Sequence, residues 1–121
     1  MQRFLRYCFV VSLPILMFIN GCATTGGQGE DRDTKIADTN LRLGIGYMQQ
    51  GKLDDALEKL QKAVDAKPDD AAVHSVLALV YDQLLEYDKA DRHYRRAIDL
   101  NPDDGGYYNN YGVFLCQRGN Q

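Results

Sequence analysis

An internal repeat limits what this 121-residue chain can fold into more than any other feature. The turn sequence KPDD ends at Asp70 and the matching sequence NPDD ends at Asp104, which sets a period of about 34 residues. The same interval relates aliphatic, aromatic and small residues: Leu43 and Leu77, Tyr47 and Tyr81, Ala56 and Ala90, and Ala63 and Ala97. A unit of this length cannot bury its apolar face alone, so the units must stack on one another.

The residues within each unit favour two antiparallel helices. Large side chains recur at helical spacing, and small residues between them let the helices approach closely. Gly51 can turn the chain between the helices of the first unit. Pro68 and Pro102 end the second helix of each unit, and the aspartates after them can cap the next helix. We therefore expect helices over residues 37–50, 54–66, 71–84, 88–100 and 105–118.

Sixteen residues at equivalent positions are expected to pack the repeats together. They are Leu43, Gly44, Tyr47, Ala56, Leu60, Ala63, Pro68, Leu77, Ala78, Tyr81, Ala90, Tyr94, Ala97, Pro102, Tyr111 and Gly112. This pattern and period are typical of tetratricopeptide repeats (TPRs). The predicted fold is an all-α, right-handed superhelix of antiparallel helix pairs: one repeat over 37–70, one over 71–104, and the first helix of an incomplete third over 105–121.

Residues 1–21 have the build of a secretory signal peptide. Arg3 and Arg6 precede the uncharged apolar run Cys8–Ile19, which is too short for a comfortable permanent membrane span. Residues 19–22, INGC, resemble a bacterial lipobox, which implies that Cys22 is lipidated and becomes the mature N-terminus. The alternative is an ordinary secreted protein in which Cys22 is incidental.

The segment behind this cysteine contains Gly, Thr and charged residues, so residues 22–36 are expected to form a flexible tether. Ala23 stands where an Asp would favour retention in the inner membrane, so the lipobox resemblance implies the outer membrane, on its periplasmic face. A lipid anchor of several acyl chains would hold the chain firmly there.

Composition excludes several function classes. Without residues 1–21 the chain carries 12 basic and 17 acidic residues, a charge that argues against nucleic acid as a partner. Cys116 is then the odd cysteine. His74 and His93 lack ligand or catalytic partners at suitable spacing. We expect no metal, cofactor, small-molecule substrate or catalysis.

A partner-binding groove is the remaining candidate site, because the first helix of each repeat lines the concave side of such a stack. In the TPR family, ligand contacts come from positions that here are Leu41, Ile45, Met48, Gln49, Ser75, Leu79, Asp82, Gln83, Asn109, Val113, Cys116 and Gln117. An extended or helical peptide could lie there. The alternative is that these residues only pack against neighbouring helices.

Three features narrow the family: the INGC motif, a first repeat close behind it, and a third repeat that opens YYNNYGVFLCQRG. Together they resemble the type IV pilus biogenesis and stability lipoproteins of the PilW/PilF family. The resemblance implies a scaffold that helps the outer-membrane secretin to localise or multimerise, and so stabilises pili by binding. Alternatives are another envelope TPR lipoprotein adaptor, for outer-membrane protein assembly or cell-wall enzymes, and an enzyme whose catalytic part lies beyond residue 121.

Members of that family continue for several more repeats, whereas this sequence ends at Gln121. We therefore expect a fragment or a truncated gene product that is marginally stable alone, with Tyr108, Tyr111 and Leu115 facing water. The resemblance also implies that Cys116 could bond a cysteine of a later repeat.

Overall fold

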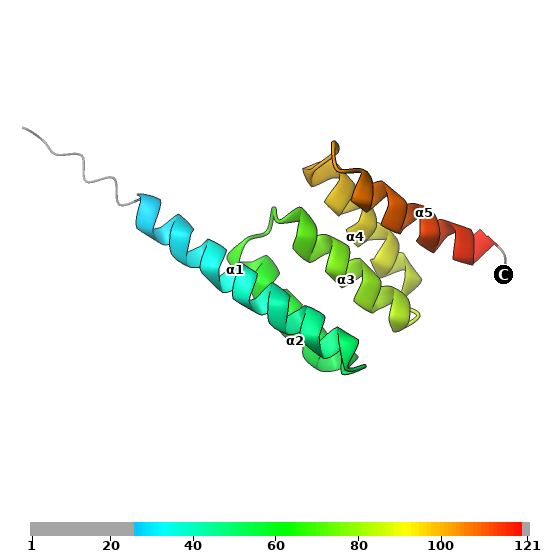
Figure 1. The fold of residues 1–121 in the computed structure, drawn as a ribbon, viewed down its shortest axis with the longest axis horizontal. Coiled ribbons are helices and arrows are strands. Elements are labelled where there is room, and N and C mark those ends of the chain that lie inside the picture. The colour runs from blue at the N-terminus through cyan, green and yellow to red at the C-terminus, as the bar shows by residue number, and fades with distance from the viewer. Residues whose placement is uncertain (1–25, 120–121) are drawn as a thin grey trace, which may run out of the picture.

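A computed structural model describes residues 26–119, and these residues form five α-helices with no β-strand among them. The helices are α1 (Gly26–Gln49), α2 (Leu53–Ala66), α3 (Ala71–Gln83), α4 (Tyr87–Leu100) and α5 (Gly105–Gly119). Figure 1 shows them stacked in chain order, with α3 between α1 and α5. The all-α prediction is confirmed. The predicted signal peptide and Cys22 lie outside the described residues.

The start of α1 differs most from the prediction. This helix begins at Gly26, so the expected tether over 22–36 is wrong for residues 26–36. No proline interrupts this stretch, and extending an existing helix adds one hydrogen bond per residue ordered. The extension also lies beside the end of α2, where Glu30 and Asp33 line a shallow pocket with Lys67 and Pro68. The other four helices match their predicted bounds to within one residue.

The stack is curved, with α1, α3 and α5 on its inner side. Each helix contacts the next along the chain, and α3 also contacts both α1 and α5. By contrast, α2 and α4 make no Cα–Cα approach within 8 Å of each other. The inner helices are therefore packed more closely than the outer ones, so the concave face is formed by the first helix of each repeat, as predicted.

Alanines, larger aliphatic residues and one aromatic cluster form the core. Ala56, Leu60 and Ala63 of α2 are fully buried against α3. Gly44 permits the close approach of α1 to α2, because a Cβ there would lie 2.6 Å from Cγ of Leu60. In the second half of the stack, Tyr94 packs between α3 and α5 in a cluster with Phe114, which is 4% exposed.

Equivalent repeat positions are buried to different extents, depending on whether another helix covers them in the stack. Leu77 contacts the preceding outer helix α2 and is 2% exposed, whereas its equivalent Leu43 is 46% exposed because no described helix precedes α1. Gly112, equivalent to Gly44, is exposed because no described helix covers that side of α5. For Leu43 and Gly112 the expected packing role is therefore wrong.

The remaining predicted packing residues divide into three groups. Gly44, Ala56, Leu60, Ala63, Leu77, Ala78, Ala90, Tyr94 and Ala97 are buried, and Tyr47, Tyr81 and Tyr111 are half-buried. Pro68 and Pro102 are exposed in turns, two residues beyond the ends of α2 and α4. This position agrees with their predicted role of stopping those helices.

The turns also repeat. Gly51 has φ +73° in the α1–α2 turn, and Leu85, at the same position one repeat later, has φ +62° in the α3–α4 turn. In both turns the next amide donates to the carbonyl of a tyrosine at the end of the preceding helix, Tyr47 or Tyr81. This left-handed C-terminal turn suits glycine, and a leucine there is strained.

Candidate partner-binding surface

Four of the twelve predicted groove residues pack against neighbouring helices, but three of them, Leu41, Met48 and Leu79, are only half-buried and keep part of their surface open to a partner. Leu41 and Met48 pack on the α2–α3 core, and Leu79 packs on the cluster around Tyr94. Ser75 is only 5% exposed, and its Oγ accepts a hydrogen bond of 3.4 Å from Nδ2 of Asn110. For Ser75 the expected contact with a partner is wrong, because the neighbouring inner helix covers it.

The other eight groove positions are accessible to a partner. Ile45 and Asp82 are half-buried, and Gln49, Gln83, Asn109, Val113, Cys116 and Gln117 are exposed. Asp82 is the single charged residue among them. The concave face is therefore mostly aliphatic and amide in character, a combination that can contact apolar side chains and bond polar backbone groups.

Asp82 also affects the core beneath this face. Burial, followed by the nearby Asp82 carboxylate, raises the pKa of Tyr94 to about 12. The Tyr94 hydroxyl is therefore neutral throughout the physiological range. Its ring tilts against Phe114 with centroids 5.1 Å apart, which fixes α5 on α4.

Tyr111 is better packed than the sequence predicted. Its hydroxyl donates a 2.7 Å hydrogen bond to Oδ1 of Asp91, and Nε of Arg95 donates to Oδ2 of the same carboxylate at 2.8 Å. Bonding to Tyr111 first, and then to Arg95, holds the pKa of Asp91 below its ordinary value. The expectation that Tyr111 faces water is therefore wrong, whereas Tyr108 and Leu115 are 50% and 47% exposed, as predicted.

A histidine pair was not foreseen from the sequence. Nδ1 of His74 lies 3.0 Å from Nδ1 of His93, and Nε2 of His74 lies 2.8 Å from the carbonyl oxygen of Pro68. A carbonyl only accepts, so in the neutral pair His74 Nε2 donates to Pro68 and His93 Nδ1 donates to His74. The pair ties α4 to the α2–α3 turn. The repeat period aligns His74 with Tyr108, another inner-helix residue with a large ring, but the sequence holds no signal that pairs His74 with His93.

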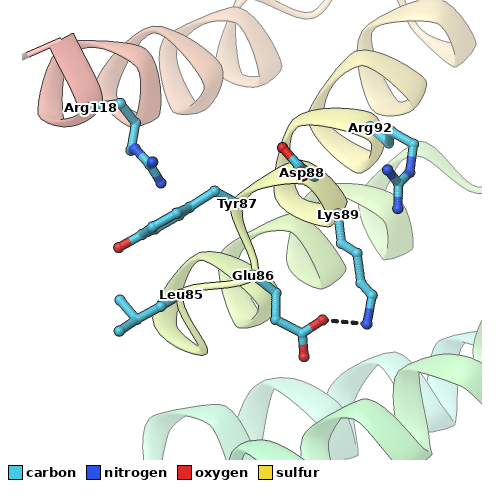
Figure 2. A pocket seen from close by; sticks show the side chains of 7 residues that line it. All are labelled: Leu85, Glu86, Tyr87, Asp88, Lys89, Arg92 and Arg118. Carbon is cyan, nitrogen blue, oxygen red and sulfur yellow. Dashed lines mark ion pairs between the residues drawn. The ribbon is translucent and has the colours of Figure 1, made fainter.

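A second surface lies at the α3–α4 turn, beside the end of α5 (Figure 2). A pocket of about 440 Å³ is lined there by Leu85, Glu86, Tyr87, Asp88, Lys89, Arg92 and Arg118. Glu86 and Lys89 form an ion pair, and Cζ of Arg118 lies 3.0 Å above the Tyr87 ring centroid. Figure 2 shows the Arg92 and Arg118 side chains well apart, so they do not form one anion site.

Within residues 26–119 no three His, Cys, Asp or Glu side chains are grouped to hold a metal ion. In the same part of the chain, no helix has the length and hydropathy of a membrane span. Cys116 is exposed and has no disulfide partner among the described residues.

Comparison with known proteins decides the family. The model of the tetratricopeptide repeat family matches residues 41–104, which is more than half of the chain, and a second tetratricopeptide repeat model matches residues 93–121. The chain belongs to the tetratricopeptide repeat family. Its period, paired helices and buried small residues are therefore the common features of these repeats.

Among curated proteins, this tetratricopeptide repeat chain is 34% identical over 104 residues to the type IV pilus assembly protein PilF of Pseudomonas aeruginosa. It is 32% identical over 109 residues to an uncharacterized protein of Haemophilus influenzae. These matches cover 83% and 89% of the chain, but only 41% and 60% of the two relatives. The chain is therefore a PilF-like repeat protein that spans about half the length of its relatives.

Solved structures agree. A structure described as a functional characterization of Pseudomonas aeruginosa PilF superposes with a TM-score of 0.69 at 34% identity, over 76% of this chain and 40% of that one. The second TPR domain of Spaghetti (RPAP3), bound to an HSP90 peptide, superposes with a TM-score of 0.68 at 19% identity, over 77% and 85%. The second likeness supports the fold alone.

Proposed function

We propose that this chain is a scaffold of type IV pilus assembly, anchored by lipid on Cys22 to the periplasmic face of the outer membrane. The observation that carries the proposal is its similarity to PilF in sequence and in three-dimensional structure. Tetratricopeptide repeats bind proteins through their curved inner surface, so the chain acts by binding and not by turnover.

The partner we propose is the outer-membrane secretin of the pilus machinery, and the contact surface is the concave face of α1, α3 and α5. The accessible aliphatic and amide side chains on that face suit a peptide segment. Binding there would help the secretin to localise or to form stable multimers.

The deciding experiment deletes the gene in its own host and compares secretin multimers on unboiled gels of fractionated membranes. The proposal expects the multimer band to collapse to monomer or to leave the outer membrane, and pili to be lost. Unchanged multimers in the outer membrane would contradict it. Loss of outer-membrane proteins in general, with normal pili, would instead favour another envelope adaptor.

The lipid anchor has its own test. In Cys22→Ser, incorporation of labelled palmitate should disappear and the chain should move to the soluble periplasmic fraction. Cys116→Ser is the matched control, since that cysteine lies on α5 and should leave labelling intact. Membrane retention of Cys22→Ser would show that lipid on this cysteine is not the anchor.

A further inference from the structure

The concave face carries two chemically uniform rows of side chains, one residue from each inner helix. Gln49, Gln83 and Gln117 occupy the same position in successive repeats, and all three are exposed. One helical turn before each glutamine stands an aliphatic residue, Ile45, Leu79 or Val113, which places each aliphatic residue beside its glutamine on one helix face.

The other groove positions do not keep their chemistry from one repeat to the next. One set reads Leu41, Ser75 and Asn109, and another reads Met48, Asp82 and Cys116. Core packing does not require the glutamines, because their side chains are exposed. A glutamine that recurs three times outside the core points to one ligand that meets the three inner helices in the same way.

The spacing of the rows limits the form of that ligand. Because α3 contacts both α1 and α5, and packed helices are usually about 8–10 Å apart, equivalent positions on successive inner helices are expected at about this interval. A polyproline II segment advances about 9 Å per turn of three residues and leaves its backbone carbonyls unbonded. In a β-strand, residues three apart point to opposite faces, so they could not all lie on one groove. In an α-helix, the backbone amides and carbonyls are already bonded to one another and are not free for the glutamines.

We infer that the row of glutamines is an amide ladder for an extended, polyproline II segment with an aliphatic residue at every third position. This inference rests on the proposed function, since it describes the partner segment that the concave face binds. Each glutamine NH₂ donates to a carbonyl of the segment, and each glutamine oxygen accepts from the N–H of the aliphatic residue. The aliphatic side chains of the segment lie on Ile45, Leu79 and Val113.

The charge of the groove agrees with such a segment. Asp82 is the single charged residue among the accessible groove positions, so these positions offer no cation to hold an acidic peptide. The partner segment is therefore neutral or basic between its aliphatic residues. An acidic version of the same segment should bind poorly, because its carboxylates would meet Asp82 and apolar surface.

The test measures binding of the full chain to a fluorescent twelve-residue peptide of repeating Leu-Pro-Pro, with repeating Asp-Pro-Pro as the comparison. We expect the first peptide to bind and the second to bind at least tenfold more weakly. Each single Gln→Glu change removes one donor and should weaken binding about two- to tenfold. The triple variant Gln49→Glu, Gln83→Glu and Gln117→Glu should weaken it more than tenfold.

The matched control is Gln61→Glu, an exposed glutamine on the outer helix α2, which should leave binding within twofold. Far-UV circular dichroism checks that all variants stay helical.

No binding of Leu-Pro-Pro by the unmodified chain, or equal binding by the triple variant, would overturn the ladder. If deletion of the gene abolishes secretin multimers but the triple variant binds the peptide as well as the unmodified chain does, the ladder is wrong and the proposed function stands. Ladder-dependent binding with unchanged multimers would instead overturn the pilus assignment alone.

Discussion

Two glycines in α1, Gly44 and Gly46, have opposite roles. A Cβ added at Gly44 would lie 2.6 and 2.8 Å from side-chain atoms of buried Leu60, whereas one at Gly46 would meet nothing within 4 Å. Gly44→Ala should therefore destabilise the protein by about 1–3 kcal/mol. Gly46→Ala should stabilise it by about 0.5–1 kcal/mol through helix propensity. Urea denaturation of both variants checks this, and a loss of stability in both would contradict it.

Leu85 is the residue under most evident backbone strain. It adopts φ +62° at the position where the first repeat has Gly51, and its side chain is 68% exposed. Leu85→Gly should remove the strain and lose almost no packing, for a net gain of about 1 kcal/mol. The reverse change, Gly51→Leu, should cost about 1–2 kcal/mol. Thermal melts of both variants are the measurement, and a lower melting temperature for Leu85→Gly would count against strain.

His93 should make stability depend on pH. Burial first, and then His74 and Arg92, lower the pKa of His93 from 6.5 to about 4 in the folded chain. The unfolded chain takes up this proton near pH 6.5, so stability is full above that pH and falls as pH drops from about 6.5 to 4. The loss should be about 1–2 kcal/mol, because the imidazole is only half-buried.

His93→Gln keeps a donor toward His74 and removes the titration, so its stability should be level between pH 6.5 and 4. Losses below pH 4 should remain in both proteins, since the lowered pKa of Asp91 belongs to that range. Urea midpoints measured at half-unit pH steps compare the two. If the urea midpoints of the two proteins fall in parallel as the pH is lowered, His93 is not the cause of the pH dependence of stability.

Among the elements, α5 depends most on the aromatic packing of Phe114. Phe114 is buried against Tyr94, and α5 touches only α4 and α3 among the described helices. Phe114→Ala should cost about 3–5 kcal/mol locally and release α5 from the stack. Hydrogen exchange should then be fast in residues 105–119 and still slow in α2 and α3. Equal loss of protection throughout would mean that the stack unfolds as one unit.

The sequence predicted four helices well because each is bounded by a turn or capping residue. The Asp70 carboxylate, for example, accepts from the backbone amides of Ala72 and Val73 at the start of α3. No comparable signal marks the start of α1, whose first residues look like a linker until they are seen beside Lys67 and Pro68. The period also predicted the inner face, but not which of its residues are covered. Ser75 of α3 is buried against α5, and the sequence of α3 alone does not show which of its residues α5 will cover.

At the scale of the whole molecule, the same repeat position can matter greatly for stability at one place in the stack and hardly at all at another. Leu43→Lys should change stability by less than about 0.5 kcal/mol, because that side chain is already 46% exposed. Leu77→Lys buries an unpaired charge at the equivalent position and should cost about 4 kcal/mol or more. Chemical denaturation of the pair is the measurement. Similar losses in both would show that α1 is covered by something outside the described helices.

The early start of α1 has a mechanical consequence for a protein held at a membrane. Only residues 23–25 separate Cys22 from a helix of 24 residues, which is about 36 Å long and packs along α2. If Cys22 carries the lipid, as proposed, the repeats stand on a stiff stalk. The length of such a stalk sets an upper limit on the height of the concave face above the bilayer, so a partner must reach to within that distance of the membrane surface.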